Sequence, residues 1–224
     1  VPAIVTITGS GSQDRDEALA PFKGFAPFRE IADSLSRRGI AVLRMDDRGF
    51  GGSGGDAATA TSADFAEDIA AGLAFLRARP EIDGARLGLV GHSEGGLIAP
   101  MVAKSDPALA AIVLLAGTAY TGRQILVFQN SNALKNDTSL TPRARDSVLA
   151  RAPTIVDSAL GGNRWLKFFG DYDPITTARA VKTPVLILNG ATDQQVTPDQ
   201  VPLLEAAFKA AGNRDVTAKV LPNL

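Results

Sequence analysis

The chain has 224 residues, of which 45% are hydrophobic and 21% charged, so it can form one domain with a substantial core. Its 23 basic and 24 acidic residues leave a net charge of −1, which argues against nucleic acid as a partner. No apolar run reaches the ~18 residues needed to cross a bilayer, so we expect no membrane insertion, and a chain without cysteine has no disulfide or thiolate metal site.

Strands and helices alternate along the first part of the chain. A β-branched run predicts a strand at 3–7, and the polar, glycine-rich stretch TGSGSQDRDE follows it as a loop. Apolar residues spaced i, i+3, i+4 and i+7 predict a helix over 28–35, and a second strand is predicted at 40–45, before the loop DDRGFGGSGG. Ser62 and Asp64 are typical of an N-cap and a first-turn acid, so the next helix is expected to begin there.

The rest of the chain repeats this alternation with one interruption. Helices are predicted directly after Ser93 and across 201–212. Residues 118–180 are more polar and largely helical, and we expect them to form a cap. Further strands are predicted at 86–91, 110–117, 184–190 and 216–221.

The predicted fold class is α/β: a doubly wound, mostly parallel sheet with a helical cap insertion. Strands that are almost continuously apolar and alternate with helices indicate a parallel sheet covered on both faces. We expect a single domain over 1–224, with the cap at approximately 118–180. Such sheets bind ligands at the carboxyl ends of their strands, and the glycine-rich loops all follow strands.

Residues 91–95 read GHSEG and match the pattern G-x-S-x-G between a predicted strand and a predicted helix. In that context the tight turn requires small flanking residues, and it would hold the hydroxyl of Ser93 above the sheet at a helix N-terminus, where amide hydrogens favour a developing anion. The alternative is an ordinary glycine-rich turn. We interpret Ser93 as a nucleophile.

A serine nucleophile needs a base, and the chain contains one histidine, His92. Because His92 is adjacent to Ser93, it should project away from the serine, and we expect it to pack or form hydrogen bonds beneath the turn. Asp193, just past the strand at 184–190, is the candidate acid of a triad. It could instead cap the following helix, but Asp199, after Pro198, is better placed for that.

The segments GHSEGG, DDRGFGGSGG and NGATDQQV together resemble the α/β-hydrolase family. TGSGSQDRDE, GHSEGGLIAP and DYDPI are similar to its bacterial esterase branch, the dienelactone-hydrolase-like and EstD-type carboxylesterases. The resemblance covers nearly the whole chain. It implies a serine hydrolase that cleaves small-molecule carboxylic esters through an acyl-enzyme, without a metal or an organic cofactor.

The resemblance also implies roles for individual residues. Ser93 would be the nucleophile and Asp193 the acid that orients the base. The oxyanion hole would use the backbone N–H of Glu94 and a second donor from the loop after the first strand, with Ser10 and Gly11 as the best candidates. Asp47 and Arg48 match a loop that is usually structural, a buried salt bridge that braces the active edge.

The family's catalytic histidine follows its last strand. Here that strand lies within VTAKVLPNL, so we expect the histidine just beyond Leu224, and we expect the family's first antiparallel strands before Val1. Acyl-peptide or thioester hydrolysis on the same fold is an alternative function, as is a non-catalytic binding module that keeps the pocket. Residues Trp165, Phe168 and Phe169 either line an acyl pocket or form the core of the cap.

Overall fold

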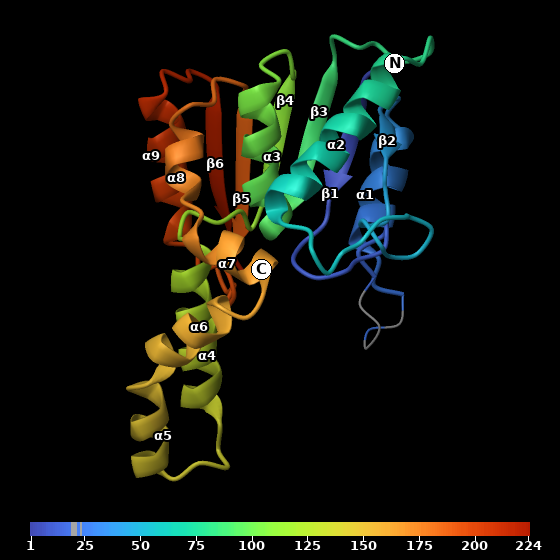
Figure 1. The fold of residues 1–224 in the computed structure, drawn as a ribbon. Helices are drawn as coiled ribbons and strands as arrows, with labels where there is room; N and C mark the ends of the chain where they lie inside the picture. Colours follow the sequence, from blue (N-terminus) through green and yellow to red (C-terminus); the bar gives the residue numbers. More distant parts are fainter. Residues whose placement is uncertain (19–21, 23) are drawn as a thin grey trace.

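The computed structural model describes residues 1–18, 22 and 24–224 and contains a six-stranded sheet in the order β2-β1-β3-β4-β5-β6 (Figure 1). Every neighbouring pair is parallel, so the predicted α/β class is confirmed. All predicted strands are present, and β2 is the shortest. The strands are β1 (Ala3–Ile7), β2 (Ala41–Leu43), β3 (Leu87–His92), β4 (Ala111–Leu115), β5 (Val185–Gly190) and β6 (Val216–Leu221).

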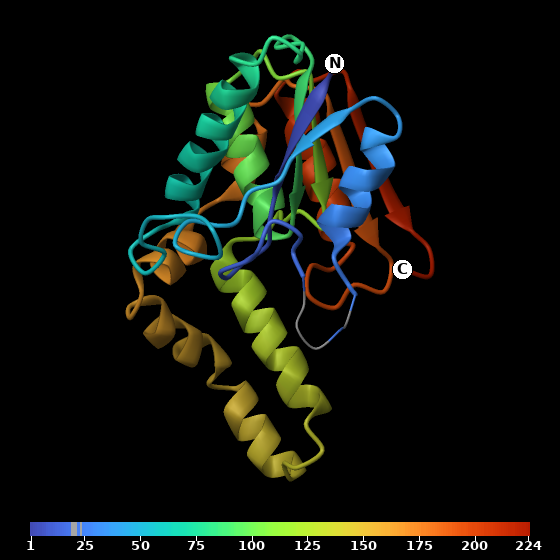
Figure 2. The same ribbon diagram turned by 90° about the vertical axis from the view of Figure 1, so that its right-hand side faces the viewer.

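Helices lie on both faces of this sheet. α2 packs against α3, α3 against α8, and α8 against α9, so these four cover one face, while α1 lies on the other (Figures 1 and 2). Right-handed crossovers between parallel strands produce this arrangement. The helices are α1 (Pro27–Ser36), α2 (Ser62–Arg77), α3 (Glu94–Ser105), α8 (Pro174–Ala178) and α9 (Gln200–Ala210).

Four helices between β4 and α8 extend away from the carboxyl edge of the sheet as an arm (Figures 1 and 2). They occupy the region expected to be a cap, and we call them the cap helices. Helix α4 packs against α5, α6 and α7, so the arm folds back on itself and returns the chain to the sheet at α7. The cap helices are α4 (Gly122–Asn136), α5 (Pro142–Leu149), α6 (Ala152–Leu160) and α7 (Arg164–Asp171).

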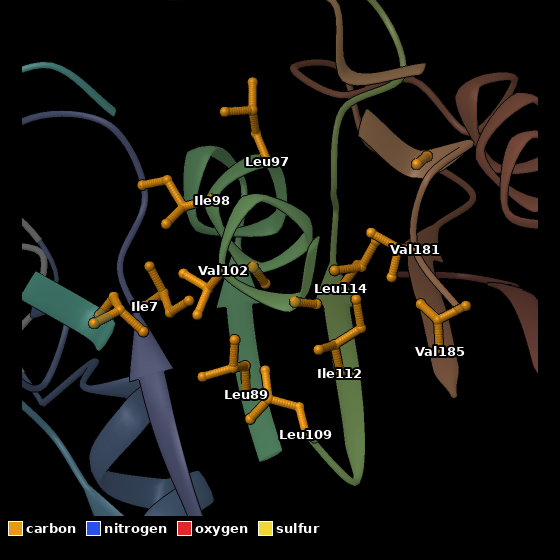
Figure 3. Close-up of a cluster of buried hydrophobic side chains, with 14 of the residues drawn as sticks. Ile7, Leu89, Leu97, Ile98, Val102, Leu109, Ile112, Leu114, Val181 and Val185 are labelled. Carbon is orange, nitrogen blue, oxygen red and sulfur yellow. The ribbon is translucent and has the colours of Figure 1, made fainter. Parts of the chain in front are cut away.

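The core lies where α3 covers the central strands (Figure 3). Leu89 of β3 and Ile112 of β4 are at most 1% exposed, and Leu97 and Val102 of α3 pack on them from the same side. Full burial of each such side chain contributes about 1.5–3 kcal/mol. The strand that ends at the candidate nucleophile is therefore enclosed in the core. Among the described residues no helix is both long and apolar enough to span a membrane.

The start of α2 differs from the prediction by one residue. Thr61, not Ser62, occupies the N-cap position, and the Asp64 carboxylate accepts bonds from its N–H (2.7 Å) and its hydroxyl (2.6 Å). Ser62 is instead the first helical residue and is fully buried. Its hydroxyl donates to Glu94, a long-range contact that residue preferences near a helix end do not reveal.

Candidate active site

Ser93 lies at a sharp strand-to-helix turn between β3 and α3. Its φ of 53° and ψ of −113° put a non-glycine residue in a strained region, which costs about 1–3 kcal/mol. Its N–H donates to the carbonyl of Leu115 (2.9 Å), which fixes the turn to the neighbouring strand β4. Such strain persists only where the surrounding structure imposes it.

The flanking glycines are required by close backbone contacts. A Cβ on Gly91 would lie 2.1 Å from the carbonyl oxygen of Gly95, and a Cβ on Gly95 would lie 2.1 Å from that of Ile7. Neither contact is sterically possible. The two glycines of the G-x-S-x-G pattern therefore let the start of α3 approach the ends of β3 and β1.

Ser93 opens onto a cavity of about 400 Å³ at the carboxyl edge of the sheet. This size and its mostly apolar walls suit a small organic ligand. Phe28 and Ile31 of α1 line one side, while the cap helices contribute an opposing apolar wall. The cap residues in that wall are Ile125, Leu126, Trp165 and Phe169.

The loop after β1 brings backbone donors to the same cavity. A Cβ on Gly9 would lie 3.4 Å from the Cβ of Ser93, so this loop runs directly beside the serine. The N–H of Gly9 is already bonded to Glu17 (2.6 Å). The N–H groups of Ser10 and Glu94 have no hydrogen-bond acceptor among the described residues, and Ser10 lines the cavity. Neither amide therefore has a hydrogen bond that a bound oxygen would have to displace.

Gly11, the other candidate donor, borders a different cavity. This second cavity, of about 650 Å³, lies between the β1–β2 side of the sheet and α2, and Asp47 and Glu94 also line it. Ser93 does not line it, so the larger cavity is not where a nucleophile would act. Of the two loop candidates, Ser10 lines the serine cavity and Gly11 does not.

His92 lines the serine cavity, and its side chain is 44% exposed, so the expected position beneath the turn is wrong. The expected hydrogen bond exists, since Nδ1 lies 2.8 Å from Oε1 of the buried Glu17. Burial alone would lower the pKa of His92, but the hydrogen bond and charge of Glu17, with the charge of Asp193, raise it above its ordinary value. His92 therefore belongs to the support of the Gly9 loop.

The predicted Asp47–Arg48 salt bridge does not form. Arg48 instead reaches α2 and pairs with Asp68 (2.7 Å). Asp47 accepts bonds from the Thr8 hydroxyl (2.7 Å) and the Gln13 N–H (2.8 Å), so it holds both ends of the loop that contains Ser10. Burial raises the pKa of Asp47 to about 6, although these two bonds oppose the shift.

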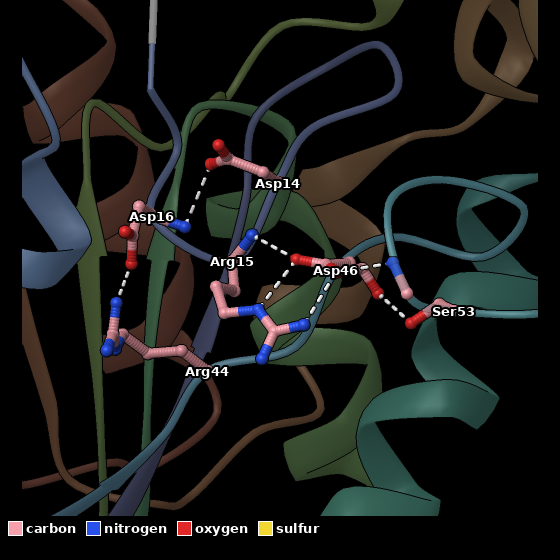
Figure 4. A network of polar contacts seen from close by, with 7 residues as sticks. Asp14, Arg15, Asp16, Arg44, Asp46 and Ser53 are labelled. Atoms are coloured by element: carbon pink, nitrogen blue, oxygen red, sulfur yellow. Dashed lines mark hydrogen bonds and ion pairs between the residues drawn. The ribbon is translucent and has the colours of Figure 1, made fainter.

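The salt bridge at this edge belongs to the preceding residue (Figure 4). Asp46 accepts two bonds from the Arg15 guanidinium, at 2.7 and 2.9 Å, and further bonds from the N–H groups of Arg15 and Gly52. The Arg15 side chain and these amides hold the pKa of Asp46 well below its usual range. A second pair, Arg44 with Asp16, lies beside it. Asp46 therefore ties the loop after β1 to the loop after β2.

Asp193 follows β5, as predicted, and lies close enough to His92 for its charge to affect that side chain. Its Oδ1 accepts the N–H groups of Gln195 (2.8 Å) and Val196 (3.0 Å), and no donor among the described residues uses Oδ2. One oxygen thus shapes the loop, and the other is available. Leu224 lies beside this loop, because its carbonyl accepts the N–H of Thr192 (2.7 Å).

Asp199 occupies the N-cap position of α9, but its side chain makes no capping bond. Its Oδ2 instead accepts the hydroxyl of Tyr120 (2.5 Å). Gln200, which is 2% exposed, accepts the N–H groups of Ala119 and Tyr120. The expected capping role is wrong, because Asp199 and Gln200 hold the start of the cap segment.

Of the three aromatic residues of α7, two line the serine cavity and one packs outside it. Trp165 and Phe169 stack on each other, with ring centroids 5.2 Å apart, and both line the serine cavity. Phe168 stacks on Tyr172 instead and does not line it. The indole N–H of Trp165 donates to Oε1 of Glu94 (2.8 Å).

Sequence reasoning missed Glu17 and the side chain of Glu94. Glu17 lies 75 residues from His92, and Glu94 lies 71 residues from Trp165. Glu17 also has a positive φ of 54°, which only the folded loop reveals. No periodicity or local motif connects residues so far apart, so only the tertiary structure identifies these pairs.

Comparison with known proteins is consistent with this geometry. The family model Hydrolase_4, described as serine aminopeptidase, S33, matches residues 25–158. Esterase EstD of Thermotoga maritima is 28% identical over 203 residues, which cover 88% of this chain and 47% of that protein, so the chain spans about half the length of this curated relative.

Solved structures show the same fold. The Pyrococcus furiosus esterase Pf2001 superposes with a TM-score of 0.70 at 20% identity, over 99% of this chain and 73% of its own. The α/β-hydrolase GrgF from Penicillium sp. superposes with a TM-score of 0.68 at 18% identity, over 100% of this chain and 81% of its own.

Proposed function

This chain belongs to the serine aminopeptidase S33 family of α/β-hydrolases, and on that premise we propose that it is the catalytic region of a serine esterase for small-molecule carboxylic esters. The observation that carries the proposal is the strained Ser93, held between two glycines at the wall of a 400 Å³ cavity. The name of the relative EstD supports ester hydrolysis over the alternatives.

In the proposed reaction the Ser93 oxygen attacks the ester carbonyl carbon while its proton passes to a base. The carbonyl oxygen becomes an oxyanion, and the free N–H groups of Glu94 and Ser10 stabilise it. The C–O bond to the alcohol then breaks, the base returns the proton to the leaving alkoxide, and an acyl-enzyme remains. Water then attacks the acyl carbon while the base takes its proton. The bond to the Ser93 oxygen breaks, the base returns the proton to Ser93, and the acid is released.

The base in this proposal is a histidine that we expect just beyond Leu224. It is supported by the position of Leu224 beside the loop that carries Asp193. Oδ2 of Asp193, on that same loop, has no donor among the described residues and could accept a bond from such a base. Asp193 would then orient the imidazole and stabilise its charged form.

The direct test is covalent labelling of the full-length protein with a fluorophosphonate, which reacts with activated serines. We expect rapid labelling of wild type and none of Ser93→Ala. Ser105→Ala, at the far end of the same helix α3, is the matched control and should be labelled like wild type. If wild type is not labelled, the proposal of an esterase is wrong, and the alternative of a non-catalytic binding module is favoured.

A second test separates the catalytic and structural roles of Asp193. Asp193→Asn keeps an oxygen that can accept the bonds from Gln195 and Val196, so the loop should stay folded. In serine proteases, exchanging the triad aspartate for asparagine lowers turnover by about 10⁴-fold. We expect a loss of ester hydrolysis on that order with little change in Tm, and an unchanged rate would remove Asp193 from the triad.

A further inference from the structure

We infer that Glu94, in addition to its backbone role, is a positioning residue whose side chain fixes Trp165 as the specificity-determining wall of the acyl cavity. The inference rests on the proposed esterase function and extends it to substrate selection. It concerns the carboxylate of Glu94, which touches no reacting atom in the proposed mechanism.

The side chain of Glu94 is buried and is held by two hydrogen-bond donors. The residue is 2% exposed, and it forms no ion pair among the described residues. One of its oxygens accepts both the Ser62 hydroxyl (2.6 Å) and the Trp165 indole N–H (2.8 Å). Burying a carboxylate without a cation is expensive, and apolar residues would stabilise the fold equally well or better. The arrangement therefore points to a role other than stability.

These two bonds join three elements at one atom. Ser62 is the first residue of α2, Glu94 the first residue of α3, and Trp165 belongs to the cap helix α7. Figure 1 shows α7 beside the ends of α2 and α3. Because Glu94 directly follows Ser93, the indole is fixed relative to the nucleophile itself.

The position of Trp165 is passed on to the rest of the cap wall. Phe169 stacks on the indole with an interplanar angle of 6° and is 4% exposed. Helix α4 meets this ring at Gly122, where a Cβ would lie 2.2 Å from the ring carbon Cδ1. Ile125 and Leu126, on the next turn of α4, line the cavity. A displacement of Trp165 would therefore move most of the wall.

The inference predicts a change in chain-length selectivity, which loss of stability alone would not produce. We would compare kcat/KM for p-nitrophenyl octanoate and p-nitrophenyl acetate in the full-length enzyme. Trp165→Phe keeps a stacking ring but loses the N–H. Glu94→Gln replaces the anionic acceptor by a neutral amide, which weakens both hydrogen bonds and puts an NH2 group into the buried site. Since one methylene in a fitted pocket changes selectivity by about 10–200-fold, we expect either change to lower the octanoate/acetate ratio about three- to tenfold, mainly through KM for octanoate.

The double variant tests whether Glu94 acts through Trp165. In the Trp165→Phe background, Glu94→Gln should leave the ratio unchanged. Ser62→Ala should lower the ratio, whereas Thr61→Ala, which removes the neighbouring buried hydroxyl that binds Asp64, should lower Tm but keep the ratio. An effect of Glu94→Gln that persists without the indole N–H, or no effect of either single change, overturns the inference.

Trp165 also supplies a readout that needs no catalysis, because it is the one tryptophan in these 224 residues. The difference between the emission spectra of wild type and Trp165→Phe isolates its fluorescence. Glu94→Gln should shift that emission to longer wavelength as the indole gains access to water, and an unshifted band contradicts the inference. If Ser93→Ala kept esterase activity, the proposed function would fail while this measurement still decided the role of Glu94.

Discussion

Replacing Gly95 by alanine tests how closely the turn at Ser93 must approach the first strand. The new Cβ would lie 2.1 Å from the carbonyl oxygen of Ile7 and 2.7 Å from that of Thr8, both backbone atoms that cannot rotate away. Contacts under 3.0 Å do not occur, so the start of α3 must move away from β1 by about 0.9 Å. Overpacking of this kind typically costs about 1–3 kcal/mol.

The same displacement separates the two proposed oxyanion donors. The N–H of Glu94 moves with α3, while Ser10 stays with the loop after β1. A misplacement of about 1 Å can lower a rate 10²-fold, and loss of one donor costs about 10²–10³-fold. We therefore expect Gly95→Ala to lower kcat for p-nitrophenyl acetate by about 10²-fold and to lower Tm by roughly 2–12 °C.

Steady-state hydrolysis, the rate of fluorophosphonate labelling and a thermal melt measure these effects on one preparation. Gly84→Ala is the matched control, because its Cβ would have its closest contact with Arg77 at 3.6 Å, an ordinary van der Waals distance. That variant should behave like wild type. If the labelling rate of Gly95→Ala is within threefold of that of wild type and its Tm is unchanged, our inference that α3 approaches β1 too closely to admit a Cβ at residue 95 is wrong.

Three further changes probe the loops around the site. Arg15 holds the pKa of Asp46 below its unfolded value of about 3.9, so Asp46→Asn should lower the free energy of unfolding by about 1–3 kcal/mol at pH 7. Urea titrations should show that the stability difference between wild type and Asp46→Asn narrows as pH falls below 4. The pKa of Asp47 is shifted the other way: its folded value of about 6 lies above the unfolded value of about 3.9, so wild type loses stability as pH rises from about 4 to just above 6. The free energy of unfolding of Asp47→Asn should therefore rise by up to about 3 kcal/mol relative to wild type between pH 4 and 7. His92→Gln should keep fluorophosphonate labelling within about tenfold of wild type, since His92 is bonded to Glu17, whereas loss of a true catalytic base costs about 10⁴-fold or more.

The elements that could be predicted from the sequence are those whose signal is local. The six strands were predictable because each is a short apolar run bounded by glycine or polar loops. The turn at Ser93 was predictable because its close contacts admit only glycine at 91 and 95. Placement of all these loops at one edge then followed from parallel topology.

The partners of charged side chains could not be predicted, because long polar side chains choose among several neighbours in space. Arg48 was expected to pair with the adjacent Asp47 and instead reaches Asp68, 20 residues away. Serine is a residue type that favours N-cap positions, but the hydroxyl of Ser62 donates to Glu94, a contact that depends on how α2 and α3 pack. Such choices are decided by burial and geometry that exist only after the chain has folded.

Helix α5, at the tip of the arm, buries none of its residues, and it packs against α4. With so little apolar surface enclosed, opening this tip costs far less free energy than opening the sheet. A protease would therefore cut this tip before it cut the sheet, and a domain inserted at the tip would be accommodated without disturbing the cavity. Insertions and deletions should also be tolerated best at this tip.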